Sequence, residues 1–416
     1  MTSRGWTLED VASWLLIGSL GVVQFKIGPA QVLFGLAAII WLVLQLREGR
    51  NPQPAFLWPL VAYGALTLVS AAFSADRAWS IVDCKQLVLF LMVPMVARLL
   101  RGRRAMTAVD VIMALGAAGA LVGIVEYALL GWDNLNKRPQ GMLSHYMTYS
   151  GVLMLVTGTA AARLLFYPSK RLWPGVAMPA LLVAIALTLT LNAYIGTAVA
   201  LTVLVAIRNW KLVALLPVVA AIGLAIAPAH VRNRVLTVSA QQDSNRDRLQ
   251  MIEMGRDMIR DHPLVGVGPD MVGRVYGRYL RPNPVHTYNP HLHNVPVQIA
   301  AERGLPALAA WLVFIVMALV GLFRQVRLGP ARAVAGAGLA AVVAMLSAGL
   351  FEYNFGDSEF LMLFLGLITL PFAASMGGDW PFAGADSPVR RTRPDASLDA
   401  GAEAPLEWTG PEGRLK

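Results

Sequence analysis

The feature that most constrains this chain is a recurring run of apolar residues, each about as long as a bilayer is thick. A spanning helix needs about 20 mostly apolar residues, because the hydrocarbon core is about 30 Å deep. Such runs recur along the 416 residues, which have a mean hydropathy of +0.56 and only 14% charged side chains. Soluble domains carry about 25% charged residues. The pattern predicts an all-α polytopic membrane protein, since helices satisfy their own backbone hydrogen bonds in lipid.

Twelve segments are long and apolar enough to be expected spans, and short loops connect most of them. They are residues 9–25, 29–46, 56–74, 80–99, 105–130, 145–167, 172–191, 193–208, 210–228, 296–323, 331–351 and 359–377. Only Asn192, Ala193 and Tyr194 mark the break between the seventh and eighth. Basic residues gather in the even-numbered short connections, such as Arg101 and Arg103 after the fourth span. Because cytoplasmic loops are enriched in Lys and Arg, both termini are expected in the cytoplasm.

Two segments are not expected to cross the membrane. Residues 229–292 form one large external loop, in which residues 248–260 have the periodicity of an amphipathic helix that lies along the membrane surface. Residues 378–416 are rich in Pro, Gly, Asp and Ala and are expected to be a disordered cytoplasmic tail. The chain therefore divides into spans one to nine (1–228), the loop domain (229–292), spans ten to twelve (293–377) and the tail.

The overall charge and the cysteine count narrow the class of protein further. A net charge of +10 suits nucleic-acid binding in a soluble chain, but here it fits topology signals and contacts with anionic lipid or phosphate, so no nucleic-acid partner is expected. The single Cys84 excludes an internal disulfide. The start of the chain has no Ala-x-Ala site, and no cleaved signal peptide is expected.

The external loop is rich in arginine. Residues 229–303 contain ten arginines, seven acidic residues and no lysine. One interpretation is a solvated face with local ion pairs. The preference for Arg nevertheless favours phosphate, because a planar guanidinium binds phosphate oxygens through two hydrogen bonds. Arg246 and Arg248 are the strongest candidates, since they lie at the start of the expected amphipathic helix.

His293 lies where the tenth span begins. Asn294 is expected to cap this helix, and Pro296 suits its first turn. The positive end of the helix dipole disfavours an imidazolium, and a neutral imidazole can accept a proton from a hydroxyl. The alternative is a His that only caps or hydrogen-bonds locally. A metal site formed by His286, His291 and His293 is disfavoured because no Cys or acid lies between them and the spacing matches no zinc motif.

Ionisable residues inside or beside the spans gather on the external side. They include Asp83, Lys85, Glu126 and Arg138. Such residues are functional hypotheses by default, although snorkelling or structural pairing also explains them. A transporter should show ionisable groups or broken helices near the middle of the bilayer, and the sequence has few of either.

Three stretches resemble the O-antigen ligase and O-antigen polymerase superfamily. The C-terminal motif of that family is similar to His293–Gly304, and its residues here are His293, Asn294, Gln298, Glu302 and Gly304. Residues 248–268, which end in Asp-His-Pro-Leu-Val-Gly-Val-Gly, resemble the end of the family's loop helix. Residues 138–141, with His145, resemble its Arg-x-x-Gly motif. Two departures are Ala307, where the family usually has Gly, and the lack of a Ser-Arg pair after the seventh span.

The resemblance implies glycan transfer on the periplasmic face of the bacterial inner membrane. The donor would be a polysaccharide on undecaprenyl diphosphate, and the acceptor a sugar hydroxyl of lipid A-core. His293 would be the catalytic base of an inverting transfer that uses no metal or other cofactor, since no Asp-x-Asp pair is present in the spans or the loop. The expected diphosphate-binding residues are Arg138, Arg246, Arg248 and Lys85. The expected supporting residues are Asn294, Gln298, Glu302 and Arg303.

Three other functions remain open at the level of sequence. A polymerase of the same superfamily would use a second lipid-linked repeat as acceptor, although a large loop between the ninth and tenth spans favours the ligase. An exporter of lipid or polysaccharide would need a water path through the bilayer, and its function would not depend on His293. A structural lipid-binding scaffold would depend on the combined charge of its arginines, and no single residue would be critical.

Overall fold

The computed structural model describes residues 6–49, 51–167, 171–237 and 242–376, with side chains in the last range from Arg246 onward. These residues form helices and connecting loops, and no strand occurs among them. The all-α prediction is therefore confirmed for the described part of the chain. The tail expected over 378–416 lies outside the described residues.

Each of the twelve apolar segments contains helix. In chain order these are α1 (Leu8–Val22), α2 (Ile27–Glu48), α3 (Leu57–Phe73), α4 (Arg77–Asp83) with η1 (Cys84–Leu91) and α5 (Met92–Leu99), α6 (Arg103–Leu130), α7 (Tyr146–Phe166), α8 (Leu172–Leu187), α9 (Leu191–Asn209), η2 (Trp210–Leu215) with α10 (Leu216–Ile226), α14 (Val295–Leu328), α15 (Arg332–Ala348) and α16 (Ser358–Met376). Among the described residues, seven helices are long and apolar enough to cross a membrane, and α3, α8 and α15 are shorter apolar helices. The chain is thus a multi-pass membrane protein, while the number twelve stays a prediction.

The break between the seventh and eighth segments lies earlier than the sequence predicts. α8 ends at Leu187 and α9 begins at Leu191, so the turn consists of residues 188–190. Leu189 adopts a positive φ of 53° in this turn. Asn192 and Ala193 therefore lie in the first turn of α9 instead of forming the break.

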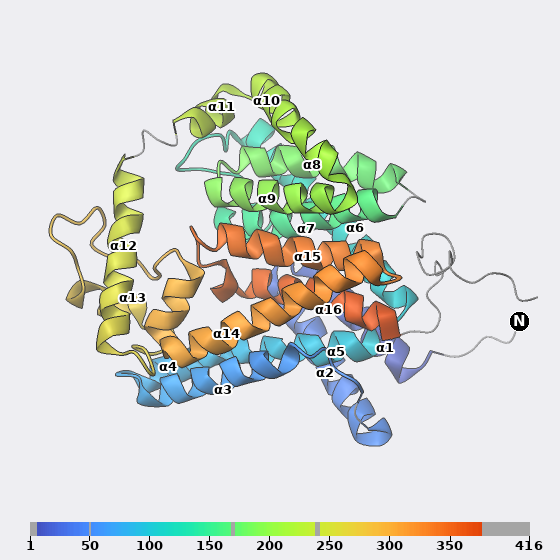
Figure 1. Cartoon of the computed structure of the whole chain (residues 1–416), viewed down its shortest axis with the longest axis horizontal. Helices are drawn as coiled ribbons and strands as arrows, with labels where there is room; N and C mark the ends of the chain where they lie inside the picture. The colour runs from blue at the N-terminus through green and yellow to red at the C-terminus, as the bar shows by residue number, and fades with distance from the viewer. Residues whose placement is uncertain (1–5, 50, 168–170, 238–241, 377–416) are drawn as a thin grey trace, which may run out of the picture.

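The long helices lie side by side in one bundle (Figure 1). Small residues let the central pair, α7 and α15, approach closely: a Cβ added at Gly158 would lie 2.8 Å from the Cβ of Ala340. α10 lies at the periphery and buries none of its residues. Its exposed side chains, such as Ile222, are apolar, which is typical of a lipid-facing helix.

The segment between α10 and α14 contains α11 (Ala229–Leu236), α12 (Gln242–Asp261), α13 (Val272–Val275) and η4 (Tyr276–Arg278). In Figure 1, α12 runs across one end of the bundle, beside α4 and the start of α14. It is amphipathic, as predicted, and buries Met251, Met254 and Met258. Because it begins at Gln242, Arg246 and Arg248 lie past its first turn, so the prediction that they lie at the helix start is wrong.

α14 is interrupted near its start. Gly304 has φ +84° and ψ 168°, and a Cβ at this position would lie 2.2 Å from the carbonyl oxygen of Leu264. Only glycine adopts this conformation without strain and leaves space for the neighbouring backbone. Gly266 is the other glycine at this backbone contact, since a Cβ added there would lie 2.2 Å from the carbonyl carbon of Glu302.

Backbone hydrogen bonds join this interruption to the segment after α12. They run from Val267 N to Ala301 O (2.9 Å), from Gly268 N to Glu302 O (2.9 Å) and from Leu305 N to Pro263 O (2.8 Å). The two glycine-containing motifs of the sequence are therefore one structural unit. This unit fixes the position of Glu302 and Arg303 at the end of the bundle where α12 lies.

Candidate active site

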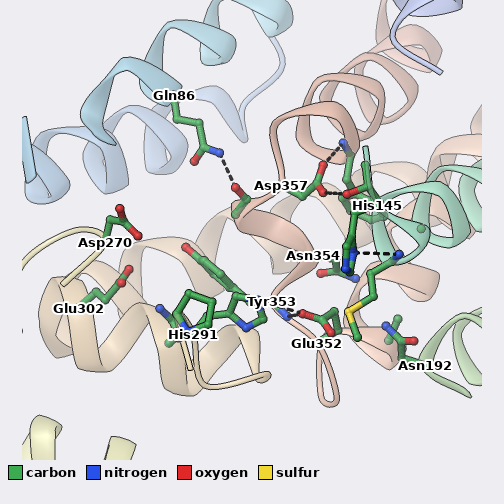
Figure 2. A pocket seen from close by; sticks show the side chains of 18 of the residues that line it. Gln86, His145, Asn192, Asp270, His291, Glu302, Glu352, Tyr353, Asn354 and Asp357 are labelled. Atoms are coloured by element: carbon green, nitrogen blue, oxygen red, sulfur yellow. Dashed lines mark hydrogen bonds and ion pairs between the residues drawn. The ribbon is translucent and has the colours of Figure 1, made fainter. Parts of the chain in front are cut away.

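A cavity of about 410 Å³ lies at this end of the bundle. Figure 2 shows that its polar side chains come from segments far apart in the sequence. They include Asp83, Gln86, His145, Thr148, Asn192, Asp270, His291, Gln298, Glu302, Arg303, Glu352, Tyr353, Asn354 and Asp357. A cavity of this size with convergent polar groups is typical of a ligand site.

His293 is paired with a carboxylate beside this cavity. Its Nδ1 lies 2.9 Å from Oε2 of Glu352, a residue that is 7% exposed in the loop between α15 and α16. Burial acts to raise the pKa of Glu352, but the hydrogen bond and charge of His293 outweigh it and lower that pKa. An ionised carboxylate only accepts hydrogen bonds, so Nδ1 carries the proton. When the ring is neutral, Nε2 keeps a free lone pair, which is the arrangement of a general base.

The backbone at His293 is strained. Its φ is +49°, a region that non-glycine residues rarely adopt. Asn294 holds the next residue in place, because its Oδ1 accepts a hydrogen bond from Val297 N (3.0 Å) and its Nδ2 donates to Leu350 O (3.1 Å). The predicted N-cap is thus confirmed. Strain kept by such surrounding bonds is typical of functional sites.

His291 lines the cavity together with His145, whereas His293 lies beside it. Its ring packs edge-on against that of His293, with centroids 4.3 Å apart. Its Nε2 lies 3.7 Å from Oε1 of Glu352, which is too long for a hydrogen bond. Burial lowers the pKa of His291 to about 4, so the ring is neutral near pH 7. A group with so low a pKa is a weak base, and the closer bond makes His293 the better candidate.

His291, His293 and Glu352 also form a group that could hold a metal ion. Their ligating atoms lie within 4.8 Å of one another. Imidazole nitrogen with a carboxylate oxygen is a donor set that zinc and iron accept. The sequence shows no such set, because the acid lies 59 residues after His293. The expectation of a metal-independent reaction is untested by this geometry and stays a prediction.

Arg303 and Glu302 are buried together at the cavity wall. Arg303 Nη1 lies 2.6 Å from Oε2 of Glu302 and 3.1 Å from the hydroxyl of Tyr353, and its Nη2 lies 3.4 Å from Oδ2 of Asp83. Gln298 accepts a hydrogen bond from Leu292 N at 2.6 Å. These contacts join α4, α14 and the loop after α15 into one frame around the histidines.

Three guanidinium groups from separate segments form a cluster around Arg234. Arg138 lies over the ring of Tyr146 at 4.2 Å, and Arg248 lies over that of Phe351 at 5.7 Å. Burial lowers the pKa of Arg234, on α11, and the charges of Arg138 and then Arg248 lower it further. The three positive charges are therefore close enough to repel one another, as expected of a site that binds an anion.

Arg234 is one of the ten arginines of residues 229–303, and the sequence alone does not single it out. Its neighbours Arg138 and Arg248 come from other segments, so no spacing pattern marks it. Two other candidates lie elsewhere. Arg246 is exposed and donates to the carbonyl of Asn283, and Lys85 is exposed on η1 and does not line the cavity.

These features define a multi-pass helical membrane protein with a histidine–carboxylate pair between a polar cavity and a cluster of arginines. Residues 176–312 match the family model described as O-antigen ligase, which supports the resemblance to the O-antigen ligase superfamily seen in the motifs. The matched residues extend from α8 into α14 and include Arg234, Arg248 and His293. A comparison with curated proteins finds no match.

Proposed function

We propose that this protein is an O-antigen ligase. It transfers polysaccharide from undecaprenyl diphosphate to a sugar hydroxyl of lipid A-core, on the periplasmic face of the inner membrane, with inversion and without a metal. The observation that carries the proposal is the pairing of His293 with Glu352 at 2.9 Å beside a polar cavity. His293 lies within the region that matches the O-antigen ligase family, and Glu352 follows that region.

In the proposed reaction, Nε2 of His293 takes the proton of the acceptor hydroxyl. The oxygen attacks the anomeric carbon of the donor, and the bond from that carbon to the phosphate oxygen breaks. The electron pair of that bond leaves with undecaprenyl diphosphate, and the anomeric centre inverts in one displacement. Glu352, which accepts from Nδ1, stabilises the imidazolium that forms.

The arginine cluster is proposed to hold the departing diphosphate. Arg138, Arg234 and Arg248 supply positive charge where negative charge develops, so no metal is required for that step. Arg234→Ala is expected to raise the KM for donor at least about tenfold, since charge-assisted hydrogen bonds contribute about 1.5–3 kcal/mol. Arg234→Lys should recover part of the loss. Arg260→Ala, at an exposed position on α12, is the control and should leave KM unchanged.

The decisive experiment uses purified protein in detergent with EDTA, a glycan on undecaprenyl diphosphate, and lipid A-core. Wild type should produce a ladder on the core lipid, and His293→Ala should lower the rate by about 10²–10⁴-fold, as for removal of a positioned base. His291→Ala should lower the rate less than His293→Ala does. A ladder that needs added Zn²⁺ after EDTA would assign the two histidines and Glu352 to a metal instead. Longer chains on the undecaprenyl carrier, without a core ladder, would identify a polymerase.

A further inference from the structure

The charge on the cavity wall is uneven. Its lining includes five carboxyl side chains, Asp83, Asp270, Glu302, Glu352 and Asp357, and one guanidinium, Arg303. Arg303 pairs with both Glu302 and Asp83, so its single positive charge is shared between two carboxylates. Among the described residues the lining therefore carries an excess of negative charge, in a chain whose net charge is +10.

Asp270 and Glu302 form one wall of the cavity, and Arg303, the guanidinium in the lining, pairs with Glu302 on that wall. Figure 2 shows Asp270 and Glu302 together, away from His145 and Asn192. Burial lowers the pKa of His145, the nearby carboxylates of Glu352 and Asp357 raise it, and the charge of Arg138 has a smaller lowering effect. Burial raises the pKa of Asp270, and the nearby charge of Asp83 raises it further. Carboxyl side chains therefore lie at both ends of the cavity, with Asp270 and Glu302 at one end and Asp357 near His145 at the other.

Three buried polar atoms in the lining have no hydrogen-bond partner among the described residues: His291 Nδ1, Asn354 Oδ1 and Arg303 Nε. Asn354 is 8% exposed, and its Oδ1 is unpaired. Arg303 is 5% exposed, and its Nε is unpaired. A buried acceptor and a buried donor left unsatisfied cost free energy, so their presence in a cavity wall indicates a hydrogen-bonding ligand. A hydroxyl satisfies both, because it donates and accepts.

We infer that the cavity is the acceptor subsite, and that its acidic wall selects a sugar without phosphate or carboxylate groups. This inference rests on the proposed function. A hydroxyl-rich sugar, neutral or amine-bearing, can hydrogen-bond to Asp270 and Asn354 and avoids repulsion from the carboxylates. In the proposed reaction the diphosphate of the donor is held by the arginine cluster, whose residues do not line the cavity, so the two substrates occupy separate subsites.

The test compares two lipid A-core acceptors that differ only in a phosphate on the terminal sugar. Wild-type protein receives each acceptor with the same undecaprenyl-diphosphate glycan, and kcat/KM for acceptor is measured from ladder formation. We expect the unphosphorylated acceptor to be preferred at least about tenfold, since like charges in an interface cost several kcal/mol. Equal use of both acceptors, or preference for the phosphorylated one, would overturn the inference while leaving the ligase reaction established.

The variant Asp270→Asn tests whether Asp270 is responsible for the preference for the unphosphorylated acceptor. Asn tolerates the positive φ of 56° at this position and keeps a side-chain oxygen that can accept from Trp79 Nε1, which now donates to Oδ2 of Asp270 at 2.9 Å. The variant should reduce the preference severalfold. Asp76→Asn is the matched control, because Asp76 pairs with Arg274 near the same wall without lining the cavity. An unchanged preference in Asp270→Asn would overturn the assignment to the acidic wall. A ladder with neither acceptor in wild type would contradict the proposed function itself.

Discussion

At the scale of single residues, the proposed chemistry depends on the charge of Glu352. Glu352→Gln keeps the shape of the side chain but removes the negative charge that stabilises an imidazolium on His293. We expect kcat to fall about 10²-fold, within the range for general-base catalysis, with little change in KM for either substrate. Glu352→Asp should recover part of the rate. The control is Glu253→Gln, because Glu253 is a half-exposed glutamate that pairs with Arg281. An equal loss of kcat in both variants would contradict the role of Glu352.

The same pair predicts how stability depends on pH. The folded protein lowers the pKa of Glu352 below its unfolded value, which is about 4.3 for a glutamate. The carboxylate therefore stabilises the fold above the unfolded pKa, and this contribution is lost as the pH falls through the folded pKa. Glu352→Gln should thus lower Tm in detergent at pH 7, and the difference from wild type should shrink below about pH 4. A constant difference across this range would show that the charge contributes nothing.

Sequence reasoning identifies residues of this site when they act through local structure. The cap at Asn294 and the start of α14 follow from a short pattern of Asn and Pro, and the structure confirms both. Glu352 and Arg234 belong to the charged residues expected on the external side, but the sequence predicts no role for either, because their roles arise from contacts with residues far along the chain. The same holds for the acidic wall, since Asp83 and Asp270 meet only when α4 and the loop after α12 fold against each other.

At the scale of elements, the interruption of α14 is what joins the loop domain to the bundle. Gly304→Ala places a methyl group 2.2 Å from the carbonyl of Leu264, at a φ that alanine rarely adopts. We expect the substitution to destabilise the protein by about 2–4 kcal/mol, measured by thermal unfolding in detergent. Gly277→Ala, where nothing lies within 4 Å of the added Cβ, is the control. Equal stability of the two variants would mean that the contact is not required.

Sequence patterns were sufficient for the helices but not for this contact. Apolar length predicts each helical segment, because a bilayer sets how much apolar chain is needed. The exception is the turn at 188–190, which contains only Thr and Leu and has no Gly or Pro to mark it. The pairing of Gly266 with the start of α14 involves backbone atoms, and no side-chain pattern reports which backbones meet.

At the scale of the whole molecule, the proposed function requires α12 and the cavity to face the periplasm. The charge bias of the short loops predicts this orientation, and cysteine labelling can test it. Cys84 is buried, so it gives little background. Arg256→Cys, exposed on α12, should react with a membrane-impermeant maleimide in cells whose outer membrane alone is opened. Arg324→Cys, near the other end of α14, should react only after the inner membrane is broken.

Arg256 and Arg324 are well suited to this comparison, because α14 runs from the end of the bundle where α12 lies to the opposite end, near Arg324. The part of α14 that follows Gly304, residues 305–328, extends about 36 Å at 1.5 Å per residue, which exceeds the thickness of the hydrocarbon core. Opposite labelling of the two cysteines is therefore the only outcome consistent with a spanning α14. If Arg324→Cys reacts first, the chain is inverted, the arginine cluster faces the cytoplasm, and a periplasmic transfer from undecaprenyl diphosphate is ruled out for this site.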